Sequence, residues 1–200
     1  MAPLRKIAIS MALFMGASVI HAFNSTTCPQ PLLSPSFEEL APVNMKPWVN
    51  IKNGLYNGAS DVRAVTTPGT DSPPAGAHSG QKSLLVRGTS TLPPDGSNIV
   101  VWQTASPLCA GATYQPRLWL TTVADANITV TARIYNAAAP AGLPISVSVR
   151  SVSGPALAWQ ELVFDTFVAP SPINRFYLDI ESSVTLFTLW LDDVTYALVI

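Results

Sequence analysis

Short runs in which apolar and polar residues alternate recur along most of this chain, and they limit the folds that it can adopt. Positions alternate between an apolar set and a polar or aromatic set in five segments, which are residues 99–104, 114–121, 128–135, 145–150 and 176–181. A period of two is typical of β-strands that bury one face. No stretch of useful length has a helical period, so the sequence predicts an all-β protein.

Turn-forming stretches separate these runs. Proline and glycine, which favour turns and interrupt strand pairing, are concentrated in residues 67–80, 91–97, 137–144 and 169–172. About ten strands at this spacing predict a β-sandwich jelly roll of two antiparallel sheets. We expect one such domain over residues 31–200, after a short N-terminal segment at residues 23–30.

Residues 1–22 have the character of a secretory signal peptide. Arg5 and Lys6 precede an apolar stretch at residues 7–20, and Ala22 is a small residue suited to the cleavage point. A membrane anchor is the alternative, but the apolar stretch is short for a span of about 20 residues. No second apolar run is long enough to span a bilayer. We therefore expect a secreted, extracellular protein without a membrane span after cleavage.

The charged residues are sparse and mixed in sign. The chain has 11 basic and 12 acidic side chains, and the loss of Arg5 and Lys6 would leave a net charge of −3. A basic patch able to hold a phosphate backbone is absent from the sequence, which argues against nucleic acid as a partner. We expect the mature protein to be a monomer.

Two kinds of covalent modification are expected of a secreted chain with this sequence. An even number of cysteines in an oxidising compartment favours one disulfide, between Cys28 and Cys109, with two free thiols as the alternative. This bond would contribute roughly 4 kcal/mol on the chain-entropy account. Asn24 and Asn127 each begin an Asn-X-Ser/Thr sequon, so both are candidates for glycosylation in a eukaryotic host.

Carboxylates interrupt an apolar run near each end of the mature chain. Glu38 lies within residues 32–39, and Asp192 and Asp193 lie within residues 189–196. Calcium prefers clustered oxygen ligands, so these three side chains would close an ion site if the two runs were adjacent strands. The apolar period slips by one residue across the two aspartates, which predicts a β-bulge there. A plain surface bulge with solvated aspartates is the alternative.

Catalytic signatures are weak in this sequence. His78, the one histidine outside the signal segment, lies in a loop rich in Gly, Ser and Pro and has no nucleophile motif beside it. A glycosidase would need two carboxylates flanking a cleft. The candidates are Glu161, Asp165, Asp179 and Glu181. Because nothing marks two of them as a pair, we expect no enzymatic activity.

A ligand surface is more plausible on the polar faces of the strands. Glycan-binding sites combine aromatic rings with planar polar side chains. The side chains that fit this description are Gln115, Arg117, Trp119, Arg133, Tyr135 and Tyr177. They would form one glycan-binding platform if their strands shared the concave sheet, and would be ordinary surface residues if those strands lay on the convex sheet.

Several motifs in this chain, taken in order, resemble those of a known family. Residues 33–38 look like an opening N-x-x-F-E strand in which Ser34 replaces the usual asparagine, and Pro47-Trp48 precedes Gly54. Residues 77–84 resemble a small-x-S-G-x-x-x-L entry to a strand, and residues 189–194 resemble a closing Asp-Asp-Val strand. Thr113-Tyr114 and Trp159 also match in place. Over residues 31–197 the chain resembles the CenC-like carbohydrate-binding modules of families 4, 9 and 22.

The resemblance implies a galactose-binding-domain-like jelly roll that binds a polysaccharide or glycan of the β-glucan or xylan type without cleaving it. It also implies a structural calcium ion between the first and last strands, at Glu38 and at Asp192 or Asp193. The proline-rich loops and the cysteine after the signal segment look like single-domain secreted proteins of filamentous fungi. A secreted structural or interaction protein, such as an effector or cell-surface component that keeps the fold without sugar binding, is the alternative, and a small glycosidase or lyase is a third possibility.

Overall fold

The structure, a computed structural model, describes residues 32, 35–40, 46–51, 59–89, 97–137, 142–184 and 186–199. The predicted signal segment, Cys28 and Asn24 therefore lie outside the described residues. The described residues form eleven strands, which are β1 Val49–Ile51, β2 Ala59–Thr66, β3 Lys82–Thr89, β4 Ser97–Ala105, β5 Thr113–Thr122, β6 Asn127–Asn136, β7 Ser146–Ser153, β8 Ala156–Val163, β9 Phe167–Val168, β10 Asn174–Ser182 and β11 Leu186–Val199. The described part of the chain contains no helix long and apolar enough to cross a membrane.

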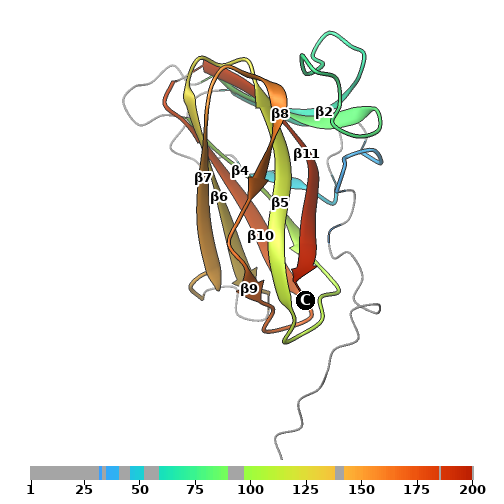
Figure 1. Cartoon of the computed structure of the whole chain (residues 1–200), viewed down its shortest axis with the longest axis vertical. Helices are drawn as coiled ribbons and strands as arrows, with labels where there is room; N and C mark the ends of the chain where they lie inside the picture. Colours follow the sequence, from blue (N-terminus) through green and yellow to red (C-terminus); the bar gives the residue numbers. More distant parts are fainter. Residues whose placement is uncertain are drawn as a thin grey trace, which may run out of the picture.

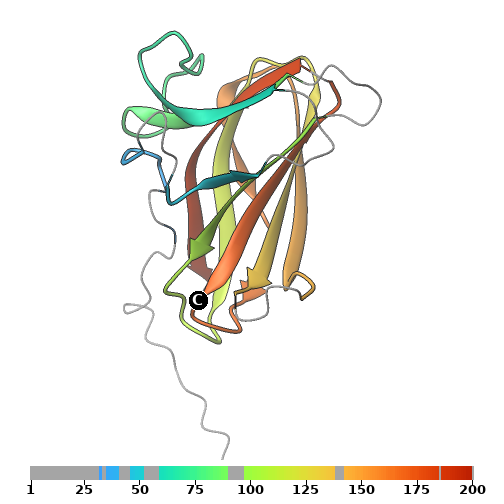
Figure 2. The same ribbon diagram turned by 180° about the vertical axis from the view of Figure 1, so that it is seen from behind.

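The strands form two antiparallel sheets packed face to face, as the alternating sequence pattern predicts (Figures 1 and 2). One sheet has the order β1-β4-β10-β6-β7 and the other has the order β2-β3-β11-β5-β8, with β9 added beside β5. Consecutive strands often lie in different sheets, and β10 and β11 each lie in the interior of a sheet.

The core fills the space between the sheets. Phe176, Leu178 and Ile180 of β10 are fully buried there, opposite Leu118 and Leu120 of β5. The intervening residues on these strands point outward, because side chains alternate between the two faces of a strand. Each sheet therefore presents its own outer face.

The predicted bulge is present in β11. The pairing of β11 with β5 shifts register between Asp192 and Thr195. Leu191 and Val194 consequently both point into the core, and both are fully buried. The bulge places Asp193 at a φ of 45°, in the left-handed region.

The N-terminal acidic run differs from its prediction. Residues 35–39 form turns rather than the expected first strand, and Phe37 has a φ of 62°. The turn still meets the last strand, because the Val194 amide donates to the Pro35 carbonyl at 2.9 Å. Phe37 is fully buried and its ring centroid lies 5.5 Å from that of Trp48. Phe37 therefore reaches the core from a turn, so the apolar residues of this segment do not indicate a strand.

The loop at residues 67–81 joins β2 to β3 at one edge of the molecule (Figure 1), and it contacts the outer face of the six-stranded sheet. Beneath it, Val65, Leu85, Trp190 and Trp159 form a second, smaller apolar cluster. The Trp190 Nε1 donates to the Asp71 carbonyl at 2.8 Å, and the Trp159 Nε1 donates to the Gly76 carbonyl at 2.9 Å. Both tryptophans thus satisfy their polar atoms on the loop while their rings pack against the sheet.

Candidate functional site

The six residues predicted to bind a ligand do not share one sheet. Gln115, Arg117 and Trp119 lie on β5, in the six-stranded sheet, whereas Arg133, Tyr135 and Tyr177 lie on β6 and β10, in the five-stranded sheet. All six point away from the core. The two groups therefore lie on opposite outer faces, and the single platform considered from sequence does not form.

The outer face of the five-stranded sheet carries a continuous aromatic cluster. Strand pairing places Trp102 of β4 beside Tyr177 of β10, and their rings are stacked with centroids 5.4 Å apart and planes at 14°. Tyr135 meets Tyr177 edge-on, with centroids 5.2 Å apart. The 5.4 Å separation of the Trp102 and Tyr177 rings is that of an offset stack, which leaves part of each ring face uncovered.

Charged side chains flank this cluster. The register places Arg133 on one side of Tyr177, and the Arg133 Nη1 lies 2.6 Å from the Asp179 Oδ2. The Arg175 guanidinium lies over the Trp102 ring, 5.9 Å from its centroid. We define the five-strand face as the surface formed by Trp102, Tyr135, Tyr177, Arg133, Arg175 and Asp179.

Two buried polar atoms on the five-strand face have no hydrogen-bond partner in the described part of the chain. They are the Trp102 Nε1 and the Asp179 Oδ1. Asp179 is only 2% exposed, and its Arg133 ion pair uses the other carboxylate oxygen. Buried polar atoms are rarely left unpaired in folded proteins, because the lost hydration is costly. The five-strand face therefore has one hydrogen-bond donor and one acceptor that no described residue pairs.

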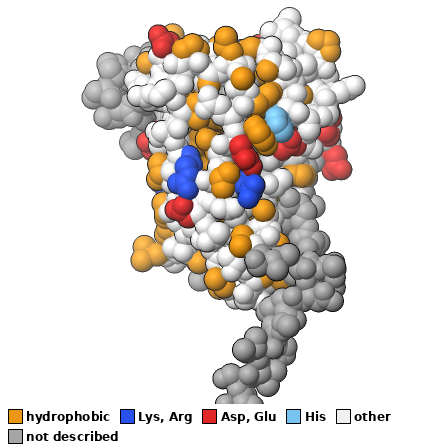
Figure 3. All heavy atoms as spheres, viewed as in Figure 1, with side chains coloured by type: hydrophobic (Ala, Val, Ile, Leu, Met, Phe, Trp, Pro, Cys, Tyr) orange, Lys and Arg blue, Asp and Glu red, His pale blue; other side chains and the backbone are white. Residues whose placement is uncertain are grey.

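On the opposite sheet, the predicted residues mostly bind one another. The Arg117 guanidinium lies 3.3 Å from the Glu161 carboxylate and donates to the Gln115 amide oxygen at 2.9 Å. The Trp119 ring is stacked against His78, with centroids 4.0 Å apart. The outer face of the six-stranded sheet is seen in Figure 3, where the histidine lies beside hydrophobic and acidic side chains. Intramolecular partners occupy much of this surface.

The three predicted calcium ligands hold the loop at residues 78–82. Glu38 Oε1 accepts the amides of Gln81 and Lys82 at 2.8 and 2.7 Å. Asp192 Oδ2 accepts the amides of His78 and Ser79 at 2.9 and 3.2 Å.

Asp193 completes this arrangement through side chains. Its Oδ2 lies 2.6 Å from the His78 Nδ1, and its Oδ1 accepts the Ser79 hydroxyl at 2.7 Å. Among the described residues, no group of three or more His, Cys, Asp or Glu side chains is arranged to hold a metal ion. The carboxylates are instead satisfied by donors of the chain, so a calcium ion here would share oxygens that already accept hydrogen bonds.

Burial dominates the electrostatics of Asp192. The residue is fully buried, and this desolvation raises the pKa of its carboxyl to about 7. The amide donors of Ser79, Asp193 and His78 oppose the shift because they stabilise the charged form. The raised pKa of Asp192 therefore reflects a cost of burial that these three amide donors only partly offset.

The remaining carboxylates considered for catalysis do not form a pair across a cleft. Glu161 lies beside Arg117, and Asp165 lies 2.7 Å from Arg150. Asp179 is paired with Arg133, and Glu181 is exposed further along β10. His78 is hydrogen-bonded to Asp193 and stacked against Trp119.

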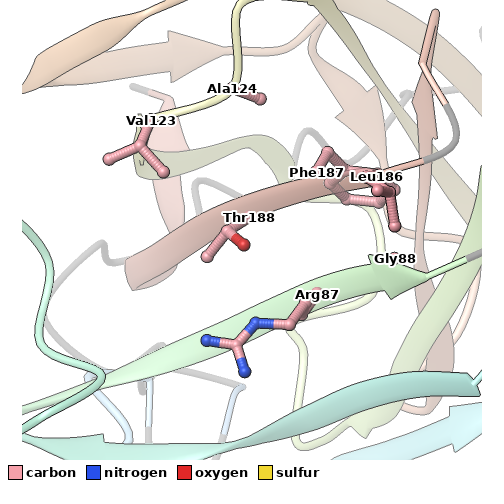
Figure 4. Close-up of a pocket in the computed structure, with 7 residues that line it drawn as sticks. All are labelled: Arg87, Gly88, Val123, Ala124, Leu186, Phe187 and Thr188. Carbon is pink, nitrogen blue, oxygen red and sulfur yellow. The ribbon is translucent and has the colours of Figure 1, made fainter.

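A groove at one end of the six-stranded sheet is lined by Arg87, Gly88, Val123, Ala124, Leu186, Phe187 and Thr188 (Figure 4). It has a volume of about 290 Å³ and is open to solvent. Leu186 is 68% exposed and Val123 is 45% exposed. The lining of the groove includes no carboxylate, and its one aromatic ring is the buried Phe187, so the groove is a weaker candidate than the five-strand face.

The modification sites are only partly described. Cys109 is disulfide-bonded in the structure, but Cys28 lies outside the described residues, so their pairing stays a prediction. Asn127 is exposed at the start of β6.

Comparison with known proteins shows which solved structures have a similar fold. No family model matches the sequence, and a search of curated protein sequences finds no match. Solved structures do match. TmCBM61 in complex with β-1,4-galactotriose aligns with a TM-score of 0.60 at 16% identity, over 86% of this chain and 99% of that one. The chain has the β-sandwich fold of a carbohydrate-binding module.

Two other similar structures agree with this assignment. The arabinose-bound α-L-arabinofuranosidase MgGH51 aligns with a TM-score of 0.61 at 14% identity, over 89% of this chain but 28% of that longer one. The C-terminal family 22 carbohydrate-binding module of Clostridium thermocellum Xyn10B aligns with a TM-score of 0.50 at 15% identity, over 82% and 89% of the two chains. At these identities the likeness establishes the fold alone.

Sequence reasoning missed half of the five-strand face. Trp102, Arg175 and Asp179 lie outside the six predicted ligand-binding residues, although Asp179 was among the candidate acids. The available signal was parity, since Arg175, Tyr177 and Asp179 occupy alternate positions of one strand. Extending the alternation by two positions on each side of Tyr177 would have found Arg175 and Asp179.

Proposed function

We propose that this chain is a non-catalytic carbohydrate-binding protein that binds a polysaccharide or glycan on the five-strand face. The observation that carries the proposal is the contact of Trp102, Tyr177 and Tyr135 in one aromatic cluster, with charged groups beside it. The finer resemblance to CenC-like modules of the single-domain fungal type belongs to this proposal as well.

The chemistry of the five-strand face suits a sugar. A pyranose ring presents an apolar face that packs on an aromatic ring, and its hydroxyls both donate and accept hydrogen bonds. Among the described residues, the Trp102 Nε1 is a donor without a partner and the Asp179 Oδ1 is an acceptor without one. Both atoms are buried in this structure, so a hydroxyl would reach them only if neighbouring side chains shift on binding.

Proteins with the same fold support this ligand class. TmCBM61 is described in complex with a β-1,4-linked galactotriose, and MgGH51 with arabinose bound. We infer from them a generic preference for plant-type polysaccharides, with β-glucan and xylan as further members of the test panel.

We also propose a setting for this function. The signal-like segment at residues 1–22 would direct the chain to secretion, and Cys28 would pair with Cys109 in the oxidising compartment. Asn127 is exposed and Asn24 is the second candidate for glycosylation. A structural calcium ion at Glu38, Asp192 and Asp193, and a monomeric state, complete the proposal.

Affinity electrophoresis against a panel of soluble polysaccharides tests the proposal. We expect retention by at least one of galactan, β-glucan or xylan, and weaker retention after Trp102→Ala or Tyr177→Ala. Truncation of a central aromatic contact typically costs about 2 kcal/mol. Trp119→Ala, which removes a tryptophan from the opposite sheet, is the matched control and should leave retention unchanged.

Thermal melting of each variant separates lost binding from lost folding. If no glycan on a broad array is bound by the folded wild-type protein, the proposal fails. The chain would then be better described as a secreted structural or interaction protein that has the same fold.

A further inference from the structure

One arginine on the five-strand face differs from the other described arginines. Arg63, Arg87, Arg117, Arg133 and Arg150 each have a carboxylate oxygen within hydrogen-bonding or ion-pair distance. Arg175 has no such carboxylate among the described residues. Its guanidinium lies instead over the Trp102 ring, whose centroid is 5.9 Å from the Arg175 Cζ.

The position of Arg175 is fixed by the strand register. It pairs with Thr104 of β4 on one side and with Tyr135 of β6 on the other. Neither neighbour has a carboxylate that could neutralise a guanidinium. Arg175 is partly buried, so its cation is held against an aromatic surface rather than extended into bulk solvent.

The other charges on β10 do not compensate Arg175. Asp179 is paired with Arg133 at 2.6 Å, which neutralises both. Glu181 lies six positions along the strand from Arg175, a separation of roughly 20 Å in an extended chain. Interactions over such distances are screened by physiological salt. The end of the five-strand face at Arg175 is therefore positive.

Arginine at such a place favours a particular ligand group. Its planar guanidinium binds carboxylates through two parallel hydrogen bonds and stacks on aromatic rings at the same time. The Trp102 contact restricts the side chain before binding, so less conformational entropy is lost when a ligand arrives. A neutral sugar would leave the positive charge uncompensated in the interface.

We propose that the five-strand face binds an acidic glycan, with the carboxylate of a uronic acid residue held by Arg175 and the sugar rings packed on the Trp102–Tyr177–Tyr135 cluster. This inference rests on the proposed glycan-binding function and names its ligand class. A sulfate ester on a sugar offers a similar anionic group, so the test must distinguish the two.

Isothermal titration calorimetry with matched polymers provides the test. The probes are polygalacturonate, alginate and glucuronoxylan, each compared with the same polymer after chemical reduction of its carboxyl groups, and a sulfated polysaccharide. Charged hydrogen bonds contribute about 1.5–3 kcal/mol, so we expect at least one acidic polymer to bind about tenfold or more tighter than its reduced form. Higher salt should reduce the difference in affinity between the acidic polymer and its reduced form.

Variants assign the preference to Arg175. Arg175→Gln should remove the difference between the acidic and reduced polymers while retaining the binding of the reduced form. Arg175→Lys should keep part of the difference, because a lysine preserves the charge without the planar fork. Arg117→Gln on the opposite sheet is the matched control and should leave the difference intact. Melting temperatures confirm that each variant is folded.

The outcomes separate this inference from the proposed function. Equal affinity for acidic and reduced polymers, or binding of neutral galactan but of no uronate polymer, would overturn the inference and leave glycan binding in place. Tighter binding of a sulfated polymer than of any uronate polymer would also overturn it. An unchanged preference in Arg175→Gln would show that Arg175 is not the binding group. If the folded protein binds no glycan at all, both proposals fail.

Discussion

Glu38 and Asp192 lie near opposite ends of the domain sequence, and both accept hydrogen bonds from the short segment at residues 78–82. Glu38 accepts the amides of Gln81 and Lys82, and Asp192 accepts those of His78 and Ser79. One carboxylate precedes every described strand and the other lies in β11. The loop before β3 is thereby joined to both the first and the last parts of the domain.

Glu38→Ala should lower the free energy of unfolding by about 2 kcal/mol. The change leaves two amides without their charged acceptor, and hydrogen bonds to charged groups contribute about 1.5–3 kcal/mol. Glu38→Gln should lose less, because it keeps one acceptor oxygen. Chemical denaturation measures both, with exposed Asp125→Ala as the control. Equal stability of Glu38→Ala and the wild type would contradict the role of Glu38.

In metal-free protein, stability should fall as pH rises from about 4 to about 7. The pKa of the Asp192 carboxyl is raised to about 7 in the folded state, from an ordinary value of 3.8. The folded chain therefore binds more protons than the unfolded chain across this window, which makes the slope negative. Unfolding measured in chelator should give a shallower slope for Asp192→Asn. A slope of the same size in both proteins would count against this assignment.

Asp71 should produce the opposite trend at lower pH. Hydrogen bonds from Arg87 and Arg63 lower the pKa of its carboxyl. The resulting stabilisation is present above pH 3.8 and is lost as pH falls through the lowered folded-state pKa. Asp71→Asn should therefore be less stable than wild type at pH 7, and the difference should be smaller at pH 2. Thermal melts at both values measure this, and a constant difference would disagree with it.

Calcium should raise the melting temperature if the predicted ion site exists. A ligand that binds only the folded state at one hundred times its Kd adds about 3 kcal/mol of stability. Asp193→Ala should abolish the increment. The Asp125→Ala variant should keep it. A wild-type melting temperature that responds to neither calcium nor chelator would exclude the site and leave the hydrogen bonds of Glu38, Asp192 and Asp193 as the whole connection.

Much of the fold could be predicted from the sequence because one face of each strand is buried. The alternation at residues 128–135 and 176–181 corresponds to β6 and β10, and the slip between Leu191 and Val194 corresponds to the bulge. The strand predicted near residues 35–39 is wrong, because Phe37 reaches the core from a turn. The strand β8 was missed because its alternation is broken, with Leu157 54% exposed.

The candidate site could be predicted less well, because alternation defines a strand's faces but not its sheet. β5 and β6 are consecutive and similar in pattern, yet they lie in opposite sheets. Sheet membership depends on partners far along the chain, such as β10 for β6 and β11 for β5. Trp119 and Tyr135 were therefore indistinguishable as platform residues until the pairing was known.

The placement of β10 and β11 also determines when this domain can form during synthesis. Each is hydrogen-bonded on both sides by strands that precede it, so neither sheet is continuous until the C-terminal part of the chain has left the ribosome. Pairings between distant segments form slowly and leave strand edges exposed meanwhile. A nascent chain truncated before β10 would thus lack the central partner of both sheets, and it should be a substrate for chaperones and proteases rather than a partly working domain.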